Sequence, residues 1–173
     1  MSRHRSLVLS VVLALWSIPA MSAPPASQVR SFRLDAPLAQ VVPLFTAEGE
    51  RRWAPGWEPA ILSGDVERGS AFITHAHGGV ETTWIVVDYR PAEGRASYAR
   101  LAQGSNIGLV DVTCTPAEEG GTVVSVRYTL TGVSEQGRAF VREFLEPERY
   151  ARMIEEWRVL TSAALAKQRS PAH

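Results

Sequence analysis

The feature that most constrains the fold is a change of hydrophobic period at Ser134. Before this residue, apolar and polar residues alternate in short segments, which is typical of half-buried strands. After it, apolar residues recur every three or four positions, which is typical of an amphipathic helix. The strand segments predicted before Ser134 cover residues 58–64, 70–77, 80–89, 95–102, 106–115 and 122–132.

Turn residues separate these strand segments. The stretches "RPAEG" and "PAEEGG" are typical of the longer loops of hairpins, and Gly78-Gly79 is predicted to be a two-residue hairpin loop. No long helical period appears among these segments, whereas parallel strands need long crossover connections that are usually helical. The sequence therefore predicts a series of consecutive antiparallel hairpins.

Helices are predicted on both sides of the strand region. Residues 134–166 form a long helix, with Ser134 as its cap and a break near Pro147, since proline removes a backbone hydrogen bond. Near the other end of the chain, a short strand at residues 29–34 precedes two short helices that Pro43 separates. Strands then follow until the C-terminal helix begins.

The first 22 residues have the pattern of a secretory signal peptide. A basic start is followed by the apolar residues 7–18, and Ala20-Met21-Ser22 is the expected cleavage signal. The apolar run is short for a membrane span, so we expect a secreted or periplasmic protein. An uncleaved N-terminal anchor is the alternative, and the only membrane association foreseen. The single cysteine, Cys114, lies far from this segment, so the signal contains no lipid-attachment cysteine.

The rest of the chain is predicted to form one domain. Residues 23–28 are assigned to a linker, residues 29–167 to the domain and residues 168–173 to a tail. Eighteen basic and eighteen acidic residues cancel, and no basic cluster is present, so no nucleic-acid partner is expected. The sequence does not indicate the oligomeric state.

Four stretches resemble those of a known superfamily: "WAPGWEPAILSG", "FITHAHGGVETTWIVVDYRP", "VSVRYTLTGVSEQG" and "YARMIEEWRVL". They are similar to stretches of SRPBCC or START-like proteins of the polyketide cyclase/dehydratase-like type. The resemblance implies an α+β helix-grip fold, in which a curved antiparallel seven-stranded sheet surrounds a long C-terminal helix, with two short helices after the first strand. It also implies a cavity between sheet and helix, and no cofactor.

Two histidines stand at the end of the segment 70–77. His75 and His77 point to one face of a strand, and a two-residue loop at Gly78-Gly79 would place His75 opposite Thr82 and both on the face of Trp84. No metal site is predicted, because no third ligand is spaced to join them. Since an imidazole titrates near neutral pH, the two are candidates for acid–base catalysis, with ligand lining or a structural role as the alternatives.

Aromatic and apolar residues from every region of the chain are candidates for the cavity lining, and a place in the core is the alternative for each. Hydrophobic lining with a few polar groups is typical of sites for small hydrophobic molecules or lipids. The predicted ligand-binding residues are Trp57, His75, His77, Trp84, Tyr98, Tyr128, Phe144, Ile154 and Trp157.

Three functions remain open on this sequence. The first is an exported protein that binds a small hydrophobic or lipid-like molecule in the cavity. The second is a cyclase-, dehydratase- or hydrolase-type enzyme that uses the same cavity with His75 and His77 as acid and base. The third is a periplasmic interaction or stress protein without a ligand. The resemblance does not choose among them, because one fold hosts many functions.

Overall fold

The computed structural model describes residues 25–75 and 81–169. Its strands agree closely with the alternating segments of the sequence. The elements are β1 (Ala26–Leu34), α1 (Leu38–Val41), the 3-10 helix η1 (Val42–Phe45), α2 (Ala47–Glu50), β2 (Ala60–Ser63), β3 (Ala71–His75), β4 (Glu81–Arg90), η2 (Pro91–Glu93), β5 (Arg95–Ala102), β6 (Asn106–Pro116), η3 (Glu118–Gly120), β7 (Thr122–Gly132), α3 (Glu135–Phe144) and α4 (Pro147–Arg169).

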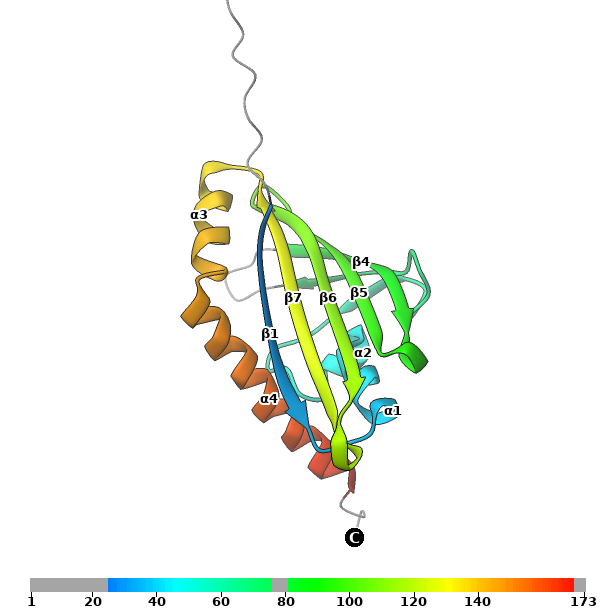
Figure 1. Cartoon of the computed structure of the whole chain (residues 1–173). Helices are drawn as coiled ribbons and strands as arrows, with labels where there is room; N and C mark the ends of the chain where they lie inside the picture. The colour runs from blue at the N-terminus through cyan, green and yellow to red at the C-terminus, as the bar shows by residue number, and fades with distance from the viewer. Residues whose placement is uncertain (1–24, 76–80, 170–173) are drawn as a thin grey trace, which may run out of the picture.

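The seven strands form one antiparallel sheet in the order β1-β7-β6-β5-β4-β3-β2 (Figure 1). Every consecutive pair from β2 to β7 is a neighbour in the sheet, and β1 closes the other edge beside β7. The register between β4 and β5 shifts between Val86 and Asp88, where β4 accommodates an extra residue. Such a bulge bends a strand, so it contributes to the curvature of the sheet. The predicted helix-grip fold is confirmed.

Both ends of the domain extend beyond the predicted limits. β1 begins at Ala26, three residues inside the expected linker, because Ala26 pairs with Leu130 and β7 is long enough to continue the ladder. The Ser27 hydroxyl also donates a hydrogen bond to the Tyr128 carbonyl (3.1 Å). α4 continues to Arg169, two residues into the expected tail. The partners that order these residues lie far away in the sequence, where a local pattern does not show them.

The predicted break near Pro147 divides the C-terminal helix into α3 and α4. Pro147 is the first residue of α4, where the missing N–H of proline costs no hydrogen bond. The carboxylate of Glu146 accepts hydrogen bonds from the backbone N–H groups of Glu148 (3.1 Å) and Arg149 (2.7 Å). It therefore caps the new helix, as the Ser134 hydroxyl caps α3 by accepting from Gly137 N–H (2.9 Å).

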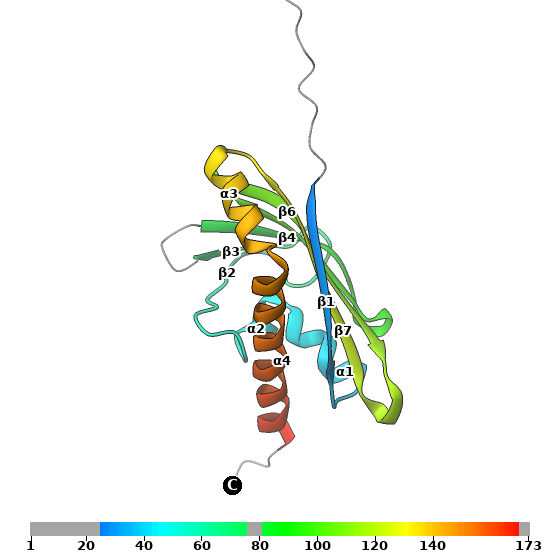
Figure 2. The ribbon, with the colours of Figure 1, turned by 60° about the vertical axis from the view of Figure 1, so that its left-hand side comes forward.

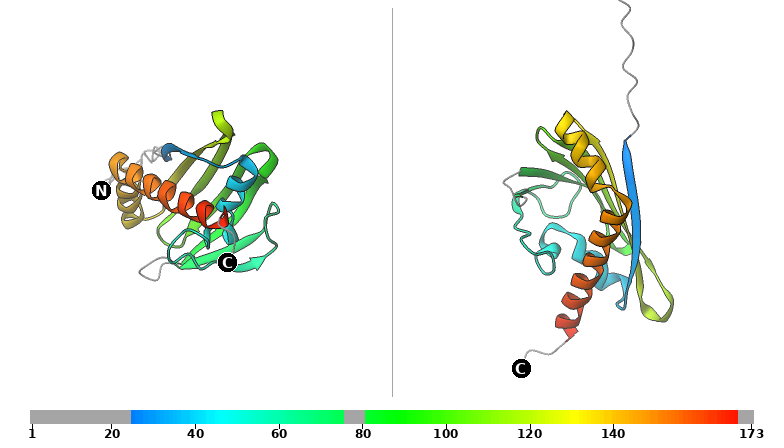
Figure 3. Two further views of the ribbon diagram at one scale, coloured as in Figure 1. Left: turned by 90° about the horizontal axis from the view of Figure 1, so that it is seen from below. Right: turned by 90° about the vertical axis from the view of Figure 1, so that its left-hand side faces the viewer.

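α4 lies across the hollow side of the bent sheet, and α1 and α2 close the lower part of the hollow (Figures 2 and 3). The core fills the space between these helices and the concave face of the sheet. Tyr150 of α4 is fully buried there, and its hydroxyl donates to the Val126 carbonyl of β7 (3.0 Å). Cys114 is buried on β6. No helix in the described part of the chain is long and apolar enough to cross a membrane.

The pairing of β3 with β4 differs from the prediction by one residue. His75 lies opposite Glu81, and Phe72 lies opposite Trp84, whereas the sequence predicted Thr82 as the partner of His75. A shift of one residue moves every side chain of a strand to the other face of its partner. The prediction depended on a two-residue turn at Gly78-Gly79, and residues 76–80 lie outside the described part of the chain.

Candidate ligand-binding cavity

A cavity of about 210 Å³ lies between the concave face of the sheet and the helices. Its floor comes from β3 to β7, and its walls come from η1, α2, the turn after α2, α3 and α4. The lining is mostly aromatic and aliphatic, with few polar groups. The lining residues are Phe45, Ala47, Glu50, Trp53, Ala54, Trp57, Phe72, Trp84, Tyr98, Arg100, Val110, Val112, Tyr128, Phe144 and Trp157.

The aromatic rings of the wall contact one another. Trp84 stacks on Phe72 with 5.9 Å between ring centroids and 7° between ring planes, and Trp57 meets the same Trp84 edge-on at 5.8 Å. Across the cavity, Trp53 and Trp157 meet edge-on at 5.1 Å. Contacts of this kind add stability beyond the area that each ring buries. They also hold the rings in fixed positions, so the cavity has a defined shape.

Four of the aromatic rings of the lining have their polar edges bonded to protein. Trp57 Nε1 donates to the Ala47 carbonyl (2.8 Å), Trp84 Nε1 to Thr74 Oγ1 (2.9 Å) and the Tyr98 hydroxyl to the Phe45 carbonyl (2.8 Å). Trp53 Nε1 is likewise bonded to the carbonyl of residue 44. Because these donors are satisfied, the rings leave mainly apolar surface for a ligand.

Glu50 is the carboxylic acid of the cavity lining. It is half-buried by surface area, because part of its surface faces the cavity, and protein atoms otherwise enclose it. No described residue donates a hydrogen bond to its side chain or pairs with it. Burial therefore raises the pKa of Glu50 from 4.5 to about 8. At neutral pH the side chain is mainly a neutral acid that can donate a hydrogen bond or a proton.

Arg100 of β5 is the second ionisable group of the lining. Its Nη1 donates to Asn106 Oδ1 (2.8 Å), and its guanidinium carbon lies 5.4 Å from the centre of the Trp84 ring, a cation–π distance. Its Nε is buried and has no hydrogen-bond partner among the described residues. Desolvation lowers the pKa of Arg100 below the ordinary value for arginine, but arginine remains charged.

Tyr128 of β7 supplies a third polar group to the same cavity. Its hydroxyl makes no hydrogen bond to another described residue. Burial raises the pKa of Tyr128, while the positive charge of Arg100 acts in the opposite direction, which indicates that the two groups are close. Within the cavity the hydroxyl is therefore a neutral hydrogen-bonding group beside a cation.

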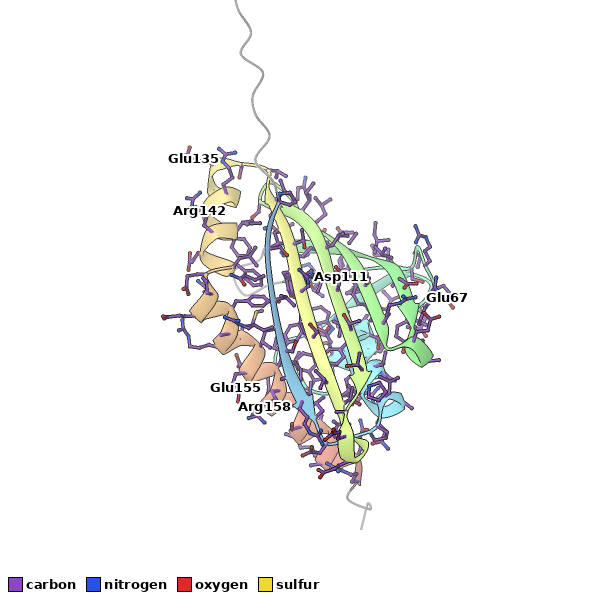
Figure 4. All side chains as sticks on the ribbon, viewed as in Figure 1. Glu67, Asp111, Glu135, Arg142, Glu155 and Arg158 are labelled. Carbon is purple, nitrogen blue, oxygen red and sulfur yellow. The ribbon has the colours of Figure 1, made fainter. Side chains whose placement is uncertain are left out.

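Other charged residues lie on the outside of the molecule. Figure 4 shows Glu135 and Arg142 along the outer edge of α3, and both are exposed. Asp111 lies on the convex face of the sheet, where it pairs in register with the exposed Arg127. In the described ranges 25–75 and 81–169, no group of three or more histidine, cysteine, aspartate or glutamate residues could hold a metal ion.

Residues 26–156 match the profile of the family described as "Polyketide cyclase / dehydrase and lipid transport". The chain belongs to this family. The match covers the whole sheet, α3 and the first part of α4, so it includes most of the cavity. A comparison with curated proteins gives no significant match.

Solved structures with the same fold have low sequence identity to this family member. Norcoclaurine synthase from Thalictrum flavum superimposes with a TM-score of 0.61 at 13% identity, over 91% of this chain and 98% of that one. The protein Ara h 8.0201 gives 0.62 at 12% identity, over 82% and 99%. The protein Mll3558 from Rhizobium loti gives 0.58 at 20% identity, over 81% and 96%. These likenesses show the fold, which is that of SRPBCC proteins.

The structure brings most of the predicted ligand-binding residues together around the cavity of this polyketide cyclase/dehydrase-type fold. Ile154 does not belong to the lining, since it is buried in the core under α4. His77 lies outside the described residues. The predicted residues that line the cavity are Trp57, Trp84, Tyr98, Tyr128, Phe144 and Trp157.

The placement of His75 in the cavity is wrong. Its side chain is 60% exposed, and its Nε2 lies 3.6 Å from Glu81 Oε2 on the neighbouring strand. The one-residue difference in register is the reason, because it puts Trp84 on the face of Phe72 and Thr74 and leaves His75 on the opposite face. His75 is therefore not placed to act as an acid or base on a ligand in the cavity.

Glu50 and Arg100 were missed by the sequence analysis, although a signal for each was present. Arg100 alternates with Tyr98 in β5, so the period of two places both side chains on one face. Glu50 follows Ala47 by three residues and precedes Ala54 by four, and this spacing places all three on one side of a helical turn. In this family member, these spacings place the two charged side chains on the same faces as their apolar neighbours.

Proposed function

We propose that this protein binds a small hydrophobic molecule in the cavity between sheet and helices, and that it does so after export. The observation that carries the proposal is the aromatic wall, most of whose polar edges are already bonded to protein. A ligand displaces little from such a wall except water. Enclosed, mostly apolar cavities with a few polar groups are typical of small-molecule sites.

A neighbour with this fold supports the proposed class of ligand. Norcoclaurine synthase from Thalictrum flavum has been solved in complex with dopamine and hydroxybenzaldehyde, and that structure has a TM-score of 0.60 at 11% identity. Both molecules are small aromatics. A cavity of about 210 Å³ suits molecules of this size better than long-chain lipids.

The test is binding of a fluorescent apolar probe, anilinonaphthalene sulfonate, to the purified protein and to a variant with a filled cavity. Ala54→Phe adds a ring to the cavity wall and should reduce saturable binding of the probe at least about tenfold. Ala139→Phe, on the exposed side of α3, is the matched control and should bind as the wild type does. Equal binding by all three proteins, or no saturable binding, would contradict the proposal.

Export is tested separately with the full chain expressed in a Gram-negative host. The basic start and the apolar residues 7–18 support a signal peptide that is removed at Ala20-Met21-Ser22. The periplasmic fraction should contain a protein whose N-terminal sequence starts at Ala23. A full-length chain that stays in the cytoplasm would contradict export without affecting the binding proposal.

Acid–base catalysis in the same cavity is the second proposal, now based on Glu50 rather than on the histidines. A carboxyl group with a pKa of about 8 can give up or accept a proton near neutral pH. Once a compound that the protein converts is known, Glu50→Gln should abolish turnover and retain binding. Unchanged turnover by that variant would exclude Glu50 as the acid or base.

A further inference from the structure

We propose that the cavity takes small aromatic molecules that carry a carboxylate, and that Arg100 is the residue that binds this group. The inference names the ligand class of the site described above, so it rests on the proposed function. It is carried by three observations about the cavity that Arg100 shares with the aromatic wall: Arg100 has no counter-ion among the described residues, neutral partners hold it in place, and Glu50 of the same lining makes no ion pair with it.

The first observation is the missing counter-ion. The hydrogen bond to Asn106 is the one that the guanidinium makes within the described residues, although the group has five N–H donors. Its Nε is buried without a partner. By contrast, several arginines nearer the surface pair with carboxylates, as in Arg51–Glu58 (2.8 Å) and Arg90–Asp88 (3.0 Å).

A desolvated charge without a counter-ion is costly, and it is normally paired when it is buried. The protein thus has unpaired cationic donors at the place where a ligand would bind. A carboxylate accepts two parallel hydrogen bonds from a guanidinium and would supply the missing negative charge. The unpaired state of Arg100 therefore indicates an anionic ligand group.

The second observation is the rigid placement of the guanidinium. Asn106 is 1% exposed, and its Nδ2 donates to Ser105 Oγ (2.9 Å), so its Oδ1 is the atom turned toward Arg100. On its other side the guanidinium lies over the Trp84 ring. Both partners are neutral, so they orient the cation without cancelling its charge. A binding group fixed before the ligand arrives loses less entropy on binding.

The third observation concerns Glu50, the carboxyl group that shares the lining with Arg100. It makes no ion pair with Arg100 among the contacts of the described residues. Burial keeps it mainly protonated at neutral pH, so it does not balance the charge. The cavity therefore carries a net positive charge, and Tyr128 adds an unpaired hydroxyl beside it. An aromatic carboxylate meets both the rings and the cation.

The test compares cinnamate with its neutral isostere cinnamamide by isothermal titration calorimetry at neutral pH. Because hydrogen bonds to charged groups contribute roughly twice as much as neutral ones, cinnamate should bind at least about tenfold more tightly to the wild type. Arg100→Gln should abolish this preference, so that the variant binds cinnamate no more tightly than cinnamamide. Arg127→Gln, on the convex face, is the matched control and should retain the preference.

The outcomes separate this inference from the proposed function. If the wild type binds cinnamamide as tightly as cinnamate, the inference is wrong and the proposed function stands. If anilinonaphthalene sulfonate binds but neither cinnamate nor cinnamamide does, the inference is also wrong. If no probe binds, both proposals fail. If Arg100→Gln does not fold, the comparison of the two ligands on the wild type still tests whether the cavity prefers a carboxylate.

Discussion

The two faces of the sheet are both apolar, yet one is covered by helices and the other is partly exposed to solvent. On the concave face, Trp84 and Tyr98 are almost fully buried beneath the helices. On the convex face, Ile85, Leu101 and Leu109 are 44–46% exposed. Ile85 is the immediate neighbour of Trp84 on β4, and alternation along the strand sends the two side chains in opposite directions. Hydrophobicity alone therefore does not determine which face lines the cavity.

The kind of side chain does differ between the faces. The concave face combines large rings with Arg100 and Tyr128, and α2 contributes Glu50 to the cavity that this face lines. The convex patch consists of branched aliphatic residues with threonines between them. An inward face is thus better indicated by aromatic residues with interspersed ionisable groups than by apolar alternation.

Substitution of the neighbours Trp84 and Ile85 is the strongest test of this difference. Trp84→Ala removes a buried ring that stacks on Phe72 and donates to Thr74, so it should lower the free energy of unfolding by about 3–5 kcal/mol. Ile85→Ala, on the exposed face, should lower it by less than about 1 kcal/mol. Urea denaturation of both variants measures the two values. Similar losses would mean that the convex face is also covered in solution.

Glu50→Gln should change how stability depends on pH. The pKa of Glu50 is about 8 in the folded protein and near its ordinary value of 4.5 in the unfolded chain. At pH values between these two pKa values, the Glu50 carboxyl has released its proton in the unfolded chain and keeps it in the folded protein. Wild-type stability should therefore fall as pH rises, by at most about 1.4 kcal/mol per pH unit, and level off above the folded pKa.

Glutamine does not titrate, so the Glu50→Gln protein should lack this decline and be more stable than the wild type near pH 8. Denaturation curves at several pH values between about 4 and 9 measure the slope. Glu48→Gln, an exposed neighbour that pairs with Arg51, is the control and should keep the wild-type decline. If the stability of the wild type does not decline with pH, the carboxyl group of Glu50 must be exposed to water.

Tyr98→Phe tests whether the wall depends on its satisfied polar edges. The substitution keeps the ring but removes the hydroxyl that donates to the buried Phe45 carbonyl. An unpaired buried carbonyl costs about 1–3 kcal/mol, so the free energy of unfolding should fall by that amount. Tyr89→Phe is the control, because its hydroxyl has no hydrogen-bond partner among the described residues. Equal effects of the two substitutions would show that the Tyr98 bond contributes nothing specific.

His75→Ala should have the smallest effect. The side chain is exposed, and its contact with Glu81 is a surface pair, so the change in unfolding free energy should stay within about 0.5 kcal/mol. Binding of anilinonaphthalene sulfonate should also be unchanged, since the residue is outside the cavity. A clear loss of probe binding would mean that the β3–β4 hairpin reaches the ligand.

The order of the elements could be predicted from the sequence because it depends on local patterns. Alternation, turn residues and the change of period at Ser134 are all properties of short stretches. Pro147 indicated the break between α3 and α4 because proline acts on the backbone directly. The resemblance to SRPBCC proteins then implied how these elements pack, and the sheet order agrees with it.

The site could be predicted only in part, because its details depend on the register and on cover from distant elements. The position of His75 depended on one assumed turn, and an error of one residue reversed its face. Glu50 and Arg100 were not among the predicted site residues, and most charged residues lie on the surface. Whether a charge is buried depends on which distant elements pack around it, and no local pattern contains that information.

The aromatic wall also has an optical consequence. The chain contains five tryptophans, of which Trp16 lies in the N-terminal apolar segment. The other four, Trp53, Trp57, Trp84 and Trp157, all line the cavity. In a form of the protein that lacks the N-terminal segment, all of the indole fluorescence arises at the cavity. The protein thus carries its own reporter, in which quenching or a shift of emission would register occupancy of the cavity without a label.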